Sequence, residues 1–220
     1  MLFYALCCVS VIFMAVTFSA IFGRRFEETA ALAVITEALL LFAAGYIKHL
    51  SIGVIGVIAI SAVGMIVSVC VCLSTARFKK LAVNTFSPGF FAFVILAILI
   101  FFMTEGKTLA DTNSLGPVAD TIRSMIETEG FAKVGVTSGA GIGFQPGYAL
   151  FGYFFTALQG SFSEPDILRG ANIFAAAMIL PLINRIRWKS FYIGVFVIPT
   201  AVLIPWVVSD HLMVFNSLNA

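Results

Sequence analysis

Charged residues are scarce in this chain, and that scarcity is the first constraint on what it is. Of its 220 residues, 11% are charged and 60% are hydrophobic. Soluble domains carry about 25% charged residues because their surfaces face water, so the composition excludes an ordinary soluble domain. The apolar residues form long unbroken runs and do not alternate with polar ones, which excludes a transmembrane β-barrel. The sequence therefore predicts a multi-pass membrane protein built from helices.

Three further absences narrow the class of protein. The basic residues form no patch of the kind that binds nucleic acid. No Lys or Arg precedes the apolar run that begins at Leu2, so we predict a retained span there and no cleavable signal peptide. The four cysteines (Cys7, Cys8, Cys70 and Cys72) have no further ligand types nearby, which favours small apolar side chains over a metal site.

The apolar runs define the predicted architecture, an all-α polytopic bundle. The six clear spans are Leu2–Phe22, Thr29–Ile47, Ile52–Ser74, Gly89–Met103, Leu168–Ile183 and Phe191–Val208. A seventh run, Gly147–Leu158, is rich in aromatic residues but falls short of the roughly twenty residues that a crossing needs. It predicts a re-entrant or interfacial helix, with a short tilted crossing as the alternative.

The same runs divide the chain into three parts. Residues 1–103 form a predicted four-span bundle, and residues 161–220 form a C-terminal segment of two spans. Between them, residues 104–160 form a long polar loop that carries the short aromatic helix. Long loops between apolar segments are uncommon and are often functional.

The distribution of Lys and Arg predicts the orientation in the membrane. Eight of the thirteen basic residues fall in three connections: Arg24, Arg25, Arg77, Lys79, Lys80, Arg185, Arg187 and Lys189. If these connections are cytoplasmic, the N-terminus, the long loop and the C-terminus lie on the extracytoplasmic side. Both ends of the Gly147–Leu158 run then lie on that side too, which favours a helix that dips into the bilayer or lies along it.

The long loop contains an amphipathic helical pattern from Pro117 to Glu129. Val118, Ile122, Met125 and Ile126 recur at helical spacing and form one apolar stripe. The stripe suits a membrane surface and a protein surface equally well, and both alternatives stay open. The glycine-rich run that follows has no strand before it, so it predicts a flexible loop and no dinucleotide site.

One ionisable residue, Glu37, falls in the middle of a predicted span. A carboxylate in this position is costly and by default suggests function. A transporter would need such groups on several spans and internal repeats, which this sequence lacks. We therefore predict a protonated Glu37 that is hydrogen-bonded between helices.

The order of motifs after residue 100 resembles that of a known enzyme family. The motifs are Asp111-Thr-Asn-Ser-Leu-Gly-Pro117, the amphipathic helix, Phe144-Gln-Pro-Gly-Tyr-Ala-Leu-Phe-Gly-Tyr153, Gly160-Ser-Phe-Ser-Glu164 and a span ending in Arg185 and Arg187. This order is similar to that of bacterial integral-membrane glycosyltransferases of the GT-C class, which are relatives of the dolichyl-phosphate-mannose protein mannosyltransferases. The resemblance covers roughly residues 101–208.

The resemblance implies transfer of a sugar from a polyprenyl-phosphate donor to a cell-envelope acceptor on the extracytoplasmic face. Asp111 corresponds to the loop aspartate of the family, which implies a general base or a ligand of a divalent metal near the donor phosphate. Gln145 and Tyr148 fall in the motif that leads into the aromatic helix and are candidate substrate-binding residues. Arg169 is a candidate for binding the lipid phosphate through two parallel hydrogen bonds. Its alternative role is an ion pair with Asp166 or Glu164.

The sequence also departs from the family pattern. Thr112 stands where the family has a second acid, and Gln145 stands where it has the first proline of a Tyr-Pro-Pro-Gly motif. Family members also continue through several more spans. The alternative hypothesis is therefore a truncated or degenerate, non-catalytic relative with a structural or assembly role, working with a membrane-protein partner.

Overall fold

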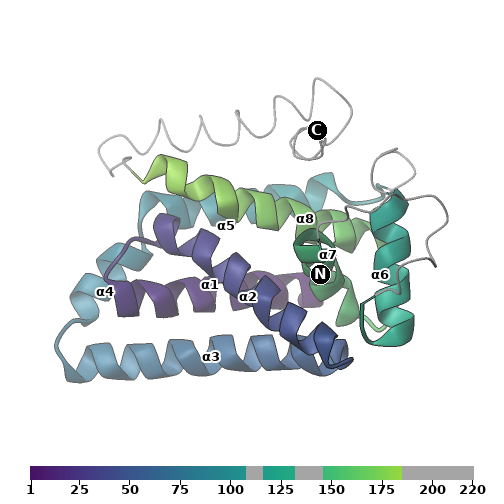
Figure 1. Ribbon diagram of the computed structural model, residues 1–220. Coiled ribbons are helices and arrows are strands. Elements are labelled where there is room, and N and C mark those ends of the chain that lie inside the picture. The colour runs from purple at the N-terminus through teal and green to yellow at the C-terminus, as the bar shows by residue number, and fades with distance from the viewer. Residues whose placement is uncertain (108–115, 132–145, 185–220) are drawn as a thin grey trace.

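The protein is helical wherever the structure describes it. A computed structural model describes residues 1–107, 116–131 and 146–184, and within these ranges it has eight α-helices, one 3-10 helix and no strand (Figure 1). The predicted all-α class is confirmed, and the length and apolarity of the helices make the chain a multi-pass membrane protein.

The first three helices are spans close to their predicted bounds. They are α1 (Leu2–Phe22), α2 (Phe26–Tyr46) and α3 (Leu50–Ser74). At 1.5 Å per residue each is at least roughly 30 Å long, which matches the hydrocarbon core of a bilayer. Helix α1 ends at Gly23, which has φ 65° and donates its N–H to the carbonyl of Ser19. This left-handed cap is a conformation that glycine adopts without strain.

The fourth predicted span is a bent pair of helices. Helix α4 (Phe78–Thr85) was not predicted, and it precedes α5 (Pro88–Met103) at an angle of 47°. Pro88 occupies the first turn of α5, where its missing N–H costs no hydrogen bond. The predicted boundary at the proline is therefore confirmed, although the bent pair together provides the spanning length.

The last span within the described residues is α8 (Glu164–Ile179), which continues into the 3-10 helix η2 (Leu180–Ile183). It begins four residues before the predicted start. The structure therefore shows four helices long and apolar enough to cross a membrane, or five if the bent pair is one span. Six spans are not shown, because the predicted span Phe191–Val208 lies outside the described residues.

The amphipathic helix of the loop, α6 (Gly116–Thr128), packs against protein. In Figure 1 it runs across the ends of the long helices. The side chains of Ile122 and Met125 are fully buried in the main hydrophobic cluster, and a Cβ on Gly152 would lie 2.9 Å from Cδ1 of Ile122. The sequence left open whether the apolar stripe faces a membrane surface or a protein surface. Ile122 and Met125 face the bundle, which settles this part of the stripe in favour of protein.

The short aromatic helix, α7 (Pro146–Ala157), lies inside the bundle, where Phe151, Phe154 and Phe155 are fully buried. Phe151 packs against Phe174 in the middle of α8, with ring centroids 5.4 Å apart. Gly170 permits this close approach, because a Cβ there would lie 2.9 Å from the Phe151 carbonyl oxygen. At 12 residues α7 is roughly 18 Å long, so it is not among the helices that could cross a bilayer.

Hydrogen bonds show at which of the two ends of the bundle each connection lies. At one end, the Leu50 N–H donates to the carbonyl of Glu129, joining the start of α3 to α6. At the other end, the Asn84 side chain donates to the Gly23 carbonyl, and Arg25 donates to the carbonyl of Asn184. The described basic connections thus share one end, and both flanks of the long loop share the opposite end, as the charge distribution predicted. Which end faces the cytoplasm stays a prediction.

Candidate functional site

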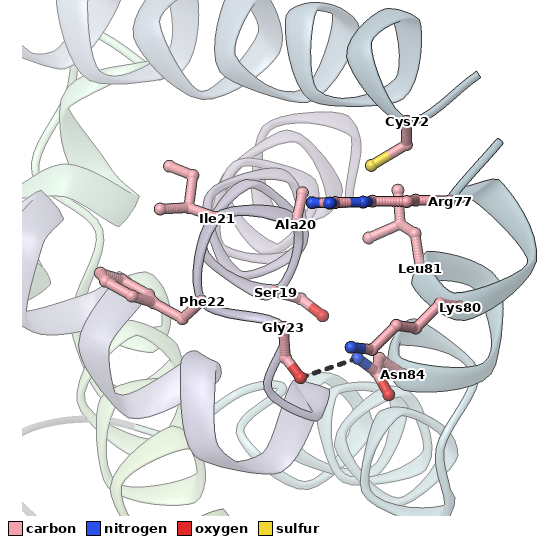
Figure 2. Close-up of a pocket in the computed structure, with 10 residues that line it drawn as sticks. All are labelled: Ser19, Ala20, Ile21, Phe22, Gly23, Cys72, Arg77, Lys80, Leu81 and Asn84. Carbon is pink, nitrogen blue, oxygen red and sulfur yellow. Dashed lines mark hydrogen bonds between the residues drawn. The ribbon is translucent and has the colours of Figure 1, made fainter. Parts of the chain in front are cut away.

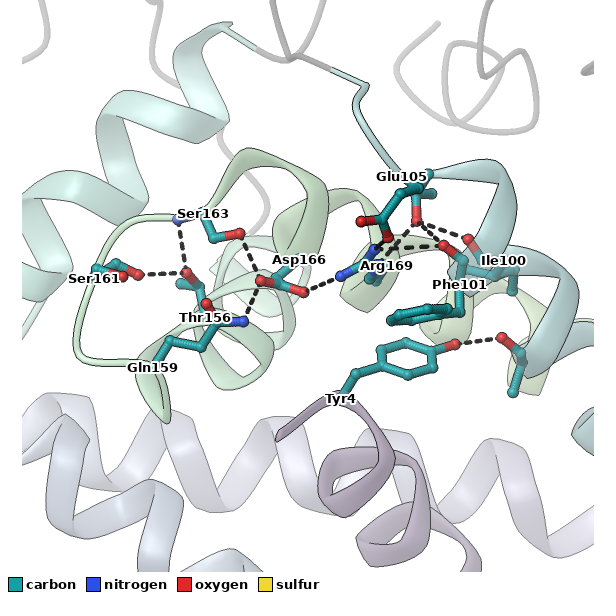
Figure 3. A network of polar contacts seen from close by, with 12 residues as sticks. Tyr4, Ile100, Phe101, Glu105, Thr156, Gln159, Ser161, Ser163, Asp166 and Arg169 are labelled. Carbon is teal, nitrogen blue, oxygen red and sulfur yellow. Dashed lines mark hydrogen bonds and ion pairs between the residues drawn. The ribbon is translucent and has the colours of Figure 1, made fainter. Parts of the chain in front are cut away.

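A buried arginine is the centre of a polar cluster at the end of the bundle that carries the long loop (Figure 3). Arg169 lies on the second turn of α8, and its side chain is only 7% exposed. Its Nη1 is 2.7 Å from Oδ1 of Asp166, which is 3% exposed, and its Nη2 is 2.5 Å from Oε2 of Glu105, which is 68% exposed. The cation therefore has one buried and one exposed partner.

The Asp166 carboxylate fixes the turn between α7 and α8. Its Oδ2 accepts hydrogen bonds from the Ser163 hydroxyl at 2.5 Å and from the Gln159 side-chain amide. The Ser163 N–H in turn donates to the Thr156 hydroxyl at 3.0 Å, at the end of α7. A buried carboxylate with this many donors is well satisfied, as burial of a charge requires.

The end of α5 holds the other side of the Arg169 guanidinium. The Nε group donates to the Thr104 hydroxyl at 3.0 Å, and Nη2 also lies 3.4 Å from the Phe101 carbonyl oxygen. The guanidinium carbon stands 4.2 Å from the centroid of the Phe101 ring and 5.8 Å from that of Tyr4. These cation–π contacts bring α1, α5 and α8 together around one charge.

One partner of Arg169, the exposed carboxylate of Glu105, can be replaced by another anion. Thr104, Phe101 and Asp166 are fixed by helices, whereas Glu105 is mostly exposed at the point where the chain leaves α5. An incoming anion that displaced Glu105 would meet the outer Nη2 of a desolvated guanidinium. Arginine binds phosphate oxygens in this way.

The sequence-predicted site residues are only partly described. Asp111 and Gln145 lie outside the described residues, and Tyr148 lies in the first turn of α7 with a side chain that is also outside them. The fourth, Arg169, forms the ion pair with Asp166 that the sequence offered as its alternative role. Its predicted role in substrate binding stays a prediction.

The sequence interpretation did not single out Glu105. The available signal was an acid two residues beyond an apolar span, on the same predicted side as Arg169. Sequence separation hid the pair, because its members are 64 positions apart in the chain.

No metal centre is present in the part of the chain that the structure describes, where no group of three or more His, Cys, Asp or Glu residues could hold an ion. A metal ligand role for Asp111 lies outside that part and stays a prediction.

A second polar group lies in the middle of the spans. The hydroxyl of Ser10 in α1 donates to Oε1 of Glu37 in α2 at 2.8 Å, and the hydroxyl of Ser61 in α3 is 3.4 Å from the same oxygen. Glu37 is completely buried, and its Oε2 has no partner among the described residues. The predicted hydrogen bonding of Glu37 between helices is confirmed.

Comparison of the chain with known protein families, with curated proteins and with solved structures finds no match.

Proposed function

We propose that this multi-pass membrane protein is a GT-C-like glycosyltransferase that uses a polyprenyl-phosphate sugar donor. The observation that supports the proposal most is the contact between Glu105 and Arg169. It ties the residue six positions before Asp111 to a buried cation on α8, at the end of the bundle where α6 also packs. The loop that carries Asp111 therefore begins beside Arg169, whose guanidinium suits a lipid phosphate.

In the proposed reaction, Asp111 accepts the proton of an acceptor hydroxyl, which is the role of a general base. The hydroxyl oxygen forms a bond to the anomeric carbon of the sugar. The bond from that carbon to the phosphate oxygen breaks, and the polyprenyl phosphate leaves with the electron pair. Arg169, with Glu105 displaced, binds the charge that grows on the leaving phosphate. Gln145, and Tyr148 in the first turn of α7, are the proposed donor-binding residues.

The second candidate function is that of a non-catalytic membrane subunit with a structural or assembly role. The observation that favours it is the completeness of the Arg169 cluster, in which every guanidinium nitrogen already has a partner. A cluster that holds helices together needs no ligand. This candidate predicts no sugar transfer by the chain alone and stable co-purification with another membrane protein.

The deciding experiment measures sugar transfer by purified chain in liposomes, with a panel of radiolabelled polyprenyl-phosphate hexoses as donors and a cell-envelope extract as the acceptor. The test variant is Asp111→Asn. Its control is Asp120→Asn, which removes an equal charge from the same loop at a residue whose only described ion pair is a long, exposed one with Arg123. We expect transfer by wild type and Asp120→Asn, and a loss of at least a hundredfold in Asp111→Asn.

Two outcomes contradict the proposal. Equal transfer by all three proteins would remove Asp111 from the reaction. Absence of transfer by the correctly folded wild type with every donor, together with a co-purifying partner, would establish the second candidate.

A further inference from the structure

A pocket of about 390 Å³ lies at the opposite end of the bundle from the Arg169 cluster. The end of α1, the end of α3 and one face of α4 enclose it (Figure 2). Among its lining residues, Arg77 and Lys80 extend from the α4 side toward the end of α1. The pocket belongs to the end that carries the described basic connections.

The two cations lie on one side of the α4 segment, with Arg77 at the N-cap and Lys80 in the first turn. Arg77, Lys80, Leu81 and Asn84 are spaced at i, i+3, i+4 and i+7, which brings them to the same side of a helix. Lys79 is on the same helix but does not line the pocket. The sequence thus provides a basic residue of the same kind, one position away, that points elsewhere.

The polar groups of the helix ends are already paired, so they do not compete for the cations. The Asn84 amide donates to the Gly23 carbonyl at 3.1 Å, and the Ser19 hydroxyl donates to the Arg24 carbonyl at 2.6 Å. Neither Arg77 nor Lys80 has an ion pair with an acidic residue of the described ranges. Within residues 1–107, 116–131 and 146–184, the pocket is therefore a positively charged recess without a counter-charge.

The acids nearest in sequence at this end have other partners. Glu28 pairs with Arg24 at 3.5 Å. Glu27 is completely buried and accepts hydrogen bonds from the first turn of α5.

Two apolar side chains at the end of α1 also border the pocket, and in Figure 2 they extend on the side of α1 away from Arg77 and Lys80. Ile21 and Phe22, the last residues of α1, line the pocket and are 65% and 57% exposed. Exposed apolar side chains at the end of a spanning helix lie at the depth where acyl chains meet headgroups. A ligand that fills this place has an anionic group beside a hydrocarbon portion.

We propose that this pocket binds the phosphate headgroup of an anionic phospholipid in the leaflet that surrounds the basic connections. Arg77 and Lys80 bind the phosphate oxygens, and Ile21 and Phe22 contact the first part of the acyl chains. Basic pockets between transmembrane helices hold such headgroups in other membrane proteins. The site is separate from the proposed transferase function and does not depend on it.

The alternative is that the three basic residues of this connection act only as a diffuse charge that orients the chain in the membrane. A diffuse charge treats Lys79 and Lys80 alike, because each adds one positive charge to the same short helix. A specific pocket treats Lys79 and Lys80 differently, because only Lys80 lines it. The two explanations therefore predict different results for two single substitutions.

The experiment is native mass spectrometry of the full chain in detergent micelles doped with phosphatidylglycerol or phosphatidylcholine. We expect wild type to retain phosphatidylglycerol in preference to phosphatidylcholine. The double substitution Arg77→Ala with Lys80→Ala should weaken retention about thirtyfold, at about one kcal/mol for each basic residue. Lys80→Ala should weaken it about fivefold, and Lys79→Ala less than twofold.

Because these side chains are exposed, each variant should keep the thermal midpoint of wild type without added lipid. Equal losses in Lys79→Ala and Lys80→Ala would overturn the pocket in favour of diffuse charge. A separate arm titrates inorganic phosphate into wild type that holds phosphatidylglycerol and follows the retained lipid. If phosphate alone competes fully with phosphatidylglycerol at equal concentration, the site binds a free anion and the lipid assignment is wrong.

Discussion

The carboxylate of Glu27 in α2 caps the first turn of α5 at Gly89. Its Oε1 accepts the Gly89 N–H at 3.1 Å, and its Oε2 accepts the Ser87 hydroxyl at 2.8 Å. A helix N-terminus has N–H groups without internal partners and a partial positive charge, and a carboxylate satisfies both. Here the cap comes from another span, so it also fixes the place of α5 beside α2.

This contact leaves no room for a side chain at Gly89. A Cβ there would overlap Cγ of Glu27 and lie 2.7 Å from its Cδ. We expect Gly89→Ala to lower the free energy of unfolding by about 1–3 kcal/mol, because Glu27 must move and its hydrogen bonds are lost. The measurement is thermal unfolding in detergent micelles.

The matched control is Gly56→Ala in α3, where nothing lies within 4 Å of an added Cβ. Ala has a higher helix propensity than Gly, so this variant should be neutral or more stable by up to about 1 kcal/mol. A Gly89→Ala variant as stable as Gly56→Ala would contradict the tight capping geometry.

The Arg169 cluster predicts unequal costs for its two acids. Asp166→Asn removes the buried partner and should cost about 3–5 kcal/mol, because it leaves a desolvated cation without its main counter-charge. Glu105→Gln removes an exposed partner and should cost at most about 1 kcal/mol. Both variants replace a carboxylate with an amide of nearly equal size, so each serves as the control for the other.

Thermal unfolding at low and high salt measures these costs. The contribution of Glu105 should fall with salt, since exposed pairs are screened, while that of Asp166 should persist. Equal destabilisation by the two variants would show that the two partners are not separated by burial as the structure has them.

Sequence patterns predicted the spans well because hydrocarbon imposes a simple rule on length and composition. The start and end of α1 agree with the prediction to the residue, and the short length of α7 was apparent from its composition. Helix α4 escaped prediction because Phe78–Thr85 is brief and partly basic, so an apolar count ends before it. Its position becomes visible only through the bend at Pro88 and the packing against α1.

The site was less predictable than the spans, because its members are distant in sequence. Nearness in the sequence suggested Asp166 or Glu164 as a partner of Arg169, and the structure has Asp166. No local pattern relates Tyr4 or Glu105 to that arginine, since the contacts arise when α1 and α5 pack beside α8. The roles of Asp111 and Gln145 depend on residues outside the described ranges and stay predictions.

The Ser10–Glu37–Ser61 group predicts that a neutral side chain suffices at position 37. Gln keeps the size of Glu37 and one acceptor oxygen for the Ser10 hydroxyl. We therefore expect Glu37→Gln to unfold within about 1 kcal/mol of wild type, in keeping with the modest strength of hydrogen bonds between spans. The measurement is thermal unfolding of the purified chain in micelles.

Glu37→Ala is the comparison variant. It removes the acceptor and leaves a cavity between three helices, which should cost about 2–5 kcal/mol. A loss in Glu37→Gln as large as that in Glu37→Ala would contradict a neutral role and point to a required negative charge.

The basic connections lie at one end of the bundle and the flanks of the long loop lie at the other. This division predicts which of them a probe reaches from outside the cell. Lys107 follows α5 at the end that carries the long loop, and Lys79 lies in α4 at the end with the basic connections. Both side chains are exposed, and each substitution by cysteine removes one positive charge. The parent for both variants is Cys70→Ala, because Cys70 is the exposed cysteine and Cys7, Cys8 and Cys72 are buried.

Because Lys and Arg collect on the cytoplasmic side, a membrane-impermeant maleimide should label Lys107→Cys in intact cells and Lys79→Cys only after lysis. The parent protein should remain unlabelled in both conditions. Labelling in the reverse pattern would invert the orientation and place Asp111 on the cytoplasmic side, where the proposed extracytoplasmic transfer could not occur. Labelling of both variants in intact cells would contradict the separation of the two ends by a bilayer.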